Sequence, residues 1–191
     1  PPLCGHDEWF GQVVSWALAD PGIPAAQKDP ANWPARMRVE WGDDKGEKAA
    51  ARHRAAMVAG FEQVRRTLDD FAPDVVLIWG DDQYENFKAD VVPAFTVCAY
   101  EDMEVRPWAE AAESTSMAGR ANIWDEPVDM TFRVRGRPDI AKGLATALLE
   151  SGIDIAYAYR PLHHPNLGHA FLNAILYLDY HRTGFDYPVI A

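Results

Sequence analysis

A run of carboxylate and amide side chains follows an apolar stretch near the middle of the chain. The apolar residues 75–79, VVLIW, show no polar alternation, which favours a strand buried on both faces of a mostly parallel sheet. Gly80 allows a turn, and five polar residues follow within six positions: Asp81, Asp82, Gln83, Glu85 and Asn86. Because α/β proteins gather their chemistry at strand ends, this turn is a candidate site for a metal ion or a polar substrate. A solvated acidic loop would have the same composition.

A second cluster consists of histidines. His163, His164 and His169 lie within seven residues, after a predicted strand and at the start of a helical pattern. Histidine is a common metal ligand and the usual acid or base near neutral pH, so the cluster is a candidate site. His163 and His164 are adjacent and should point in different directions, so at most one is expected to share a centre with His169. The alternative is that all three are loop or helix-start residues bonded to the backbone.

Other candidates carry weaker signals. His6 could bind a metal with Asp7 or Glu8, but a histidine near a chain end is more often solvated. The alternating arginines Arg133, Arg135 and Arg137 could bind a carboxylate or line a solvated strand face. His53 is expected at the surface of a helix, and His181 is expected in a turn before the last strand. The chain has neither a glycine-rich phosphate loop nor a serine or cysteine nucleophile elbow, which disfavours nucleotide chemistry and acyl transfer.

Composition favours a soluble globular protein. The 191 residues fit a single domain, and 48% of them are hydrophobic. Lys and Arg number 18 against 29 Asp and Glu, and the resulting net charge of -11 argues against a nucleic-acid partner. Cys4 and Cys98 lie far apart, so neither a disulfide framework nor a thiolate metal site is indicated, and a cytoplasmic location is expected. The sequence contains no apolar stretch of membrane-spanning length and no signal segment.

Apolar spacing predicts alternating helices and strands. Helices are expected over 7–19, over 47–71 and from Pro138, and another from about Phe171. The second helix should present one apolar face, made of Met57, Phe61, Val64, Leu68 and Phe71. Further strands are expected over 94–100, 130–134 and 153–159, whereas 101–122 lacks regularity. The segment 21–46 reads as a Pro- and Trp-rich irregular excursion packed on the surface. Together these elements predict a three-layer α/β domain, with a central mostly parallel or mixed sheet flanked by helices.

Two sequence blocks carry a family resemblance. VVLIWGDDQYENF followed by VVPAF, and HHPNLGHAFLNAILYLDY followed by GFDYPVI, resemble the class III extradiol ring-cleaving dioxygenases, the superfamily of the protocatechuate 4,5-dioxygenase beta subunit. The resemblance covers most of the chain, with its specific part in these two blocks. It implies an oxidoreductase of aromatic compound catabolism that uses non-haem Fe(II) and O2 to open the ring of a catechol-type diol.

The resemblance also implies roles for particular residues. Gln83 stands where the family has a histidine metal ligand, in a branch with a Gly-Asp-Asp-Gln pattern, and Asp82 is the alternative ligand there. His169, in GHAF, matches a histidine that contacts substrate or bound oxygen, with His164 as a possible helper. The family's first histidine ligand precedes a segment like Pro1-Pro2-Leu3, and its acid/base histidine and glutamate ligand follow the strand that begins near Tyr187. Residues 1–191 are therefore expected to be a domain truncated at both ends, without a complete metal centre.

Two other functions remain open at this point. Gln83 suits a metal-free or metal-altered member of the same fold that binds a ligand or acts as a scaffold. A metal-dependent hydrolase is the other alternative, with Zn(II) held by Asp81, Asp82 and His169. Tryptophans could form a homo-oligomer interface or cover the chain's own core: Trp33, Trp41, Trp108 and Trp124.

Overall fold

The computed structural model describes residues 6, 8–109, 121–164 and 166–191, and it confirms the predicted α/β class. Pro1-Pro2-Leu3 and Cys4 lie outside the described residues. The helices are α1 (Glu8–Ala19), α2 (Ala25–Lys28), the 3-10 helix η2 (Pro30–Asn32), α3 (Ala35–Trp41), α4 (Glu47–Phe71), α6 (Pro138–Glu150) and α7 (His169–Leu178). The strands are β1 (Val76–Leu77), β2 (Thr96–Cys98), β3 (Met103–Val105), β4 (Phe132–Val134), β5 (Ala156–Ala158) and β6 (Val189–Ile190).

The strands form three two-stranded sheets, and further backbone hydrogen bonds link neighbouring sheets. β1 pairs parallel with β6, β2 pairs parallel with β5, and β3 pairs antiparallel with β4. On the side of β6 away from β1, Val189 N–H donates to the Arg135 carbonyl and Cys98 N–H donates to the Ala191 carbonyl, each at 2.8 Å. β6 therefore has β1 on one side and the backbone at the ends of β4 and β2 on the other, and both parallel and antiparallel pairs are present, as the sequence predicted.

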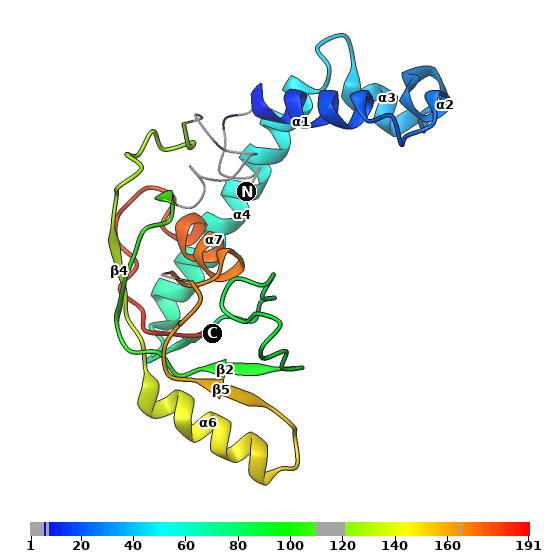
Figure 1. Ribbon diagram of the computed structural model, residues 1–191. Coiled ribbons are helices and arrows are strands. Elements are labelled where there is room, and N and C mark those ends of the chain that lie inside the picture. Colours follow the sequence, from blue (N-terminus) through cyan, green and yellow to red (C-terminus); the bar gives the residue numbers. More distant parts are fainter. Residues whose placement is uncertain (1–5, 7, 110–120, 165) are drawn as a thin grey trace.

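Alternation along β2 distributes its side chains to two helix layers. Cys98 and Tyr100 belong to the core under α7, whereas Val97 and Ala99 pack against α6. Successive side chains of an extended segment point to opposite faces, which explains how β2 and the two residues after it contribute to both layers. Figure 1 shows α6 below β2 and β5, with α7 and α4 on the other side of the sheet. These are the three layers that the sequence predicted.

Local signals explain where the two flanking helices begin. Pro138 stands in the first turn of α6, where its missing N–H costs nothing, and Asp139 places a negative charge at that helix N-terminus. α7 begins after Gly168, and its apolar residues recur at helical spacing: Phe171, Leu172, Ile175 and Leu176, all buried. Burial of a side chain of this size contributes about 1.5–3 kcal/mol. Both helices are therefore held mainly by their packing on the sheet.

The long helix α4 packs with only part of its predicted face. The Phe61 ring stacks on Tyr177 of α7 with centroids 5.1 Å apart, and Met57 packs against the same cluster. Val64 and Phe71, predicted to be on the apolar face, are exposed. The side chain that meets the end of α7 here is Arg65, which donates to the carbonyls of Leu178 and Gly184. The stem of an arginine can cover apolar surface while its guanidinium donates to carbonyls. The spacing of apolar residues does not reveal that an arginine makes this contact.

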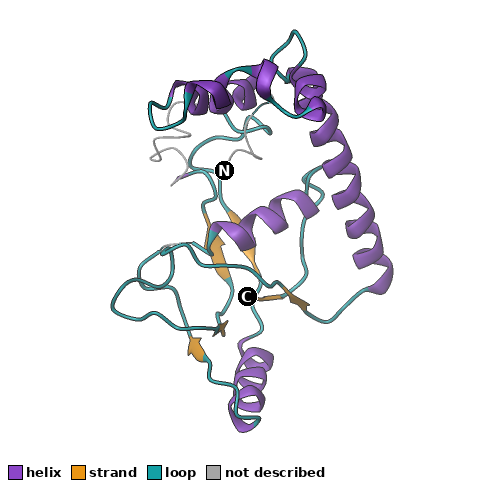
Figure 2. Ribbon diagram, turned by 90° about the vertical axis from the view of Figure 1, so that its right-hand side faces the viewer, coloured by secondary structure: helices purple, strands orange, loops and turns teal. Residues whose placement is uncertain are grey.

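The N-terminal helices lie at the far end of α4 from the sheet (Figures 1 and 2). The prediction of an irregular excursion over 21–46 was wrong in part, because this segment contains α2, η2 and α3. Pro24 and Pro34 directly precede α2 and α3 as their N-cap residues, so the prolines start short helices here. The rings of Trp33 and Trp41 meet edge to face with centroids 5.3 Å apart.

Two strand predictions need correction. The expectation that 75–79 is buried on both faces was wrong, since Leu77 is 58% exposed and Trp79 is 80% exposed. β1 pairs with β6, and α6 covers Val75 but leaves the following residues of the same face uncovered. β3 was missed in the segment predicted to be irregular, because three residues carry too little periodicity to be recognised. Within the described ranges, no helix combines the length and apolar character needed to cross a bilayer.

Candidate functional site

The turn over 80–87 packs directly against the beginning of α7, and glycines make this approach possible. A Cβ atom at Gly80 would lie 2.9 Å from Cε1 of Phe171, and one at Gly168 would lie 3.0 Å from Nδ2 of Asn86. Such distances are shorter than ordinary van der Waals contacts, so side chains at either position would force the two segments apart. The structure therefore brings together the carboxylate-rich turn and the histidine-rich segment.

Asp82 organises the turn. Its Oδ1 accepts hydrogen bonds from the backbone N–H of Asn86 at 2.8 Å and from Asn86 Nδ2 at 3.1 Å, and its Oδ2 accepts from Phe87 N–H at 3.2 Å. Partial burial acts to raise the pKa of Asp82, but these hydrogen bonds outweigh it and hold the pKa below its usual value. The carboxylate is thus ionised at neutral pH, and both of its oxygens are engaged within the turn.

Glu85 and His169 form the closest contact between the two segments. Glu85 Oε2 lies 2.9 Å from His169 Nδ1, and both carboxylate oxygens accept from the His169 backbone N–H at 3.2 Å. His169 is the first residue of α7, so the Glu85 charge also lies at a helix N-terminus, where a negative charge is stabilised. The sequence singles out His169, whereas Glu85 is one of five polar residues in the predicted turn. The 84 residues between them explain why spacing gave no signal.

Buried polar groups lie beside this pair. Asn86 is 5% exposed, and its Oδ1 has no hydrogen-bond partner among the described residues. Burial raises the pKa of the Tyr100 hydroxyl, with further contributions from the neighbouring Cys98 side chain and from the negative charge of Asp82. Burial likewise raises the pKa of the Cys98 thiol. Tyr100 and Cys98 are therefore neutral groups in the core beneath the turn.

The remaining predicted residues are dispersed. Gln83 is exposed, and its Nε2 donates to Asp81 Oδ2 at 3.1 Å. His163 Nε2 lies 3.2 Å from Asp90 Oδ2. His164 Nδ1 accepts from the backbone N–H of Asn166 at 3.2 Å. Of the three clustered histidines, His169 is the one that contacts the carboxylate-rich turn.

The donor atoms in the described ranges do not fit a complete iron site. No three histidine, cysteine or acidic side chains gather there closely enough to hold a metal ion. The Asp82 oxygens already accept three hydrogen bonds, and Gln83 offers a neutral amide. A facial Fe(II) site of two histidines and one carboxylate would need further ligands.

The weaker candidates have internal partners. Each of the three alternating arginines pairs with an aspartate, Arg133 with Asp102, Arg135 with Asp186 and Arg137 with Asp139. Arg133 is exposed in β4, whereas Arg135 and Arg137 are partly exposed between β4 and α6. His6 pairs with Asp125 at 3.2 Å, while its predicted neighbour Asp7 lies outside the described residues. His53 and His181 are exposed and pair with Glu40 and Glu62, which confirms their predicted surface and turn positions.

Comparison with known proteins gives a consistent set of similarities. The chain is 31% identical over 120 residues to a 2,3-dihydroxyphenylpropionate/2,3-dihydroxicinnamic acid 1,2-dioxygenase from a Rhodococcus species, a match over 63% of this chain and 31% of that protein. A second protein of this name, from Pseudomonas putida, is 30% identical over 128 residues, or 66% of this chain and 32% of its own. A third, from Rhodococcus jostii (strain RHA1), is 29% identical over 117 residues, a match over 61% of this chain and 30% of that protein.

These relatives are considerably longer than the matched region. The chain spans about a third of the length of the curated relatives it matches. No family model matches the chain. The chain is thus similar, over about three fifths of its length, to curated proteins that are named as dioxygenases.

Proposed function

We propose that this chain forms part of an extradiol dioxygenase that opens the ring of a catechol-type aromatic with O2 and non-haem Fe(II). Two independent supports converge on this function. The relatives at about 30% identity are named as dioxygenases of dihydroxyphenyl acids. The observation that carries the proposal is the contact between Glu85 and His169, because it places an oriented imidazole where the two resembling blocks meet.

His169 is the proposed acid/base residue. Ring opening beside a diol requires removal of a hydroxyl proton, and an imidazole is suited to take and return a proton near neutral pH. The His169 side chain is 35% exposed, so a substrate can reach the ring from solvent. His164, five residues earlier, is the proposed helper that contacts the substrate.

Fe(II) in such enzymes brings the diol and O2 together at open coordination positions. Asp82 and Gln83 are the candidate ligands within this chain, as the resemblance implies. The described side chains do not complete a ligand set around them, so the chemistry proposed for this chain is confined to substrate contact and proton transfer.

Replacement of His169 in the full-length parent protein tests the proposal. His169→Ala should lower the rate of diol ring opening about 100-fold or more, the usual loss when a general acid or base is removed. Ring opening is measured by oxygen uptake and by the absorbance of the ring-opened product. His163→Ala is the matched control, because that ring pairs with Asp90 and not with a carboxylate of the turn, and it should leave the rate near wild type. A His169→Ala enzyme as active as wild type would contradict the assignment.

A ligand-binding protein without iron is the second candidate. It is favoured by Asp82, whose oxygens are engaged by hydrogen bonds of the turn. Anaerobic calorimetric titration of the parent protein with Fe(II) separates the two functions. Tight stoichiometric binding supports the dioxygenase, whereas the absence of binding, together with retained affinity for a diol, supports the ligand-binding protein.

A further inference from the structure

Glu85 holds His169 through two different contacts. Its carboxylate accepts from the His169 backbone N–H and also lies 2.9 Å from the ring Nδ1. The Glu85 side chain is 19% exposed, so water competes less for these contacts than it would at the surface. A Cβ atom at Gly168 would lie 3.1 Å from Glu85 Oε2, and the glycine is therefore what allows the carboxylate to approach. Both the start of α7 and its first side chain are fixed by one carboxylate.

This pair differs from the other histidine–carboxylate pairs in the described part of the chain. The others join a carboxylate to Nε2 of a more exposed ring: His6, His53, His163 and His181. His169 is paired through Nδ1, the nitrogen nearer the backbone. A carboxylate can only accept a hydrogen bond, so Nδ1 must carry the proton. The Nε2 atom, at the outer end of the ring, is then the nitrogen left to exchange a proton.

We propose that Glu85 is a positioning residue for His169, which fixes the Nδ1–H form of the ring and thereby makes Nε2 the proton-exchanging atom. The inference rests on the proposed function, because it assigns a role in the same reaction. Which nitrogen of the His169 ring carries the proton can be measured without an activity assay. A carboxylate in this place acts as the partner that orients a catalytic imidazole in other enzymes.

The test uses Glu85→Leu and Glu85→Gln in the full-length parent protein. Leu removes the hydrogen-bond acceptor, whereas Gln keeps an acceptor oxygen without the charge. The 15N chemical shifts of the His169 ring, assigned by comparison with His169→Ala, report which nitrogen carries the proton. We expect a clear Nδ1–H signature in the wild type, its loss in Glu85→Leu and its partial retention in Glu85→Gln. Glu62→Gln, beside His181, is the matched control and should leave the His169 ring unchanged.

Turnover supplies the second measurement. Glu85→Leu should lower kcat for ring opening by about 10- to 100-fold while changing KM for the diol little, as loss of an orienting partner does. Glu85→Gln should recover part of that loss. An unchanged proton position on His169 in Glu85→Leu would overturn the inference, as would an unchanged kcat in a variant that has lost the Nδ1–H form. A wild-type protein with the Nδ1–H form but no ring opening would instead overturn the proposed function and, with it, the catalytic role of Glu85.

Discussion

Cys98 lies in the core beneath the candidate site, where its surroundings suppress its reactivity. Burial raises the pKa of its thiol, and the negative charge of Asp82 acts in the same direction. The thiolate is the reactive form, so Cys98 should be inert in the folded protein. In a Cys4→Ser background, a thiol reagent should modify Cys98 about 100-fold faster after denaturation than before it. Equal labelling rates in the two states would show that this part of the sheet is open.

Gly136 is required by a close backbone approach. A Cβ atom there would overlap the carbonyl oxygen of Tyr100 and lie 2.9 Å from the carbonyl group of Glu101. Gly136→Ala should therefore lower the free energy of unfolding by about 3 kcal/mol, the upper range for overpacking. Gly143→Ala is the control, because nothing lies within 4 Å of that position in α6. It should raise stability by about 0.5–1 kcal/mol through helix propensity. Urea denaturation measures both, and an unaffected Gly136→Ala protein would contradict the described approach of these segments.

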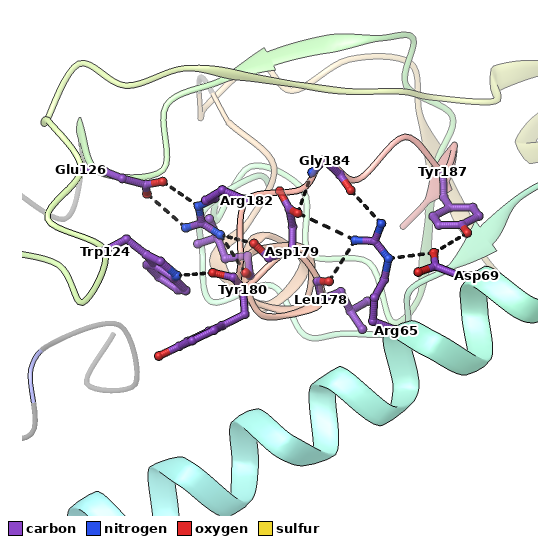
Figure 3. Close-up of polar contacts among 11 residues, drawn as sticks. Arg65, Asp69, Trp124, Glu126, Leu178, Asp179, Tyr180, Arg182, Gly184 and Tyr187 are labelled. Atoms are coloured by element: carbon purple, nitrogen blue, oxygen red, sulfur yellow. Dashed lines mark hydrogen bonds and ion pairs between the residues drawn. The ribbon is translucent and has the colours of Figure 1, made fainter.

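At the scale of elements, Arg182 connects the end of α7 to the segment that carries Trp124 (Figure 3). Its Nε and Nη2 donate to the two carboxylate oxygens of Glu126, and its Nη1 donates to the carbonyls of Leu176 and Asp179. The guanidinium also lies 4.0 Å from the centroid of the Trp124 ring. One planar guanidinium thus donates to the carbonyls at the end of the helix and to both oxygens of one carboxylate.

Replacement of Arg182 should loosen this junction. Arg182→Ala should lower the free energy of unfolding by about 2 kcal/mol, since it removes hydrogen bonds to charged and backbone groups. Arg182→Lys should restore little of the loss, because an ammonium cannot reproduce the planar, two-pronged contact. Urea denaturation monitored by tryptophan fluorescence measures the change, and full rescue by lysine would contradict the geometry described for the guanidinium.

The first turn of α6 gives a pH-dependent contribution to stability. The Arg137 guanidinium donates to both oxygens of Asp139 and, with the backbone, lowers the pKa of that carboxyl from 3.8 to about 2. A lowered pKa means stability that is present above the unfolded value and lost as pH falls through the folded value. In Asp139→Asn, the free energy of unfolding should therefore decrease less than in the wild type as the pH falls from about 4 to about 2. Urea midpoints across this range measure it, and identical slopes for the two proteins would refute the contribution.

At the scale of the whole molecule, the sequence predicted most of the helices and the layer order. Regular spacing of large apolar residues located α4, α6 and α7, and alternation in β2 accounts for the two faces of the sheet. The exposure of Leu77 and Trp79 was not predicted, because burial of these side chains depends on how far α6 extends over β1. Of the tryptophans considered for an oligomer interface, Trp108 is buried and packs with Trp124 inside the chain's own core.

The candidate site was only half predictable. His169 is a predicted site residue from its sequence context, whereas its contact partner Glu85 was visible only as one acceptor among several in a turn. Contacts between residues far apart in sequence depend on the layers coming together, and no local period encodes them. Asp82 likewise has a carboxylate, which is a typical metal ligand, but in the folded turn both carboxylate oxygens accept hydrogen bonds from Asn86 and Phe87.

We propose that this chain forms part of a ring-opening dioxygenase. Oxygen consumption by the Fe(II)-loaded, full-length parent protein in the presence of 2,3-dihydroxyphenylpropionate, the substrate named for its relatives, tests it most directly. We predict that oxygen and diol disappear in equimolar amounts, with formation of a ring-opened product, and that His169→Ala abolishes most of this reaction. Diol that remains intact in the presence of bound Fe(II) and O2, with this and other catechols, would contradict the claim.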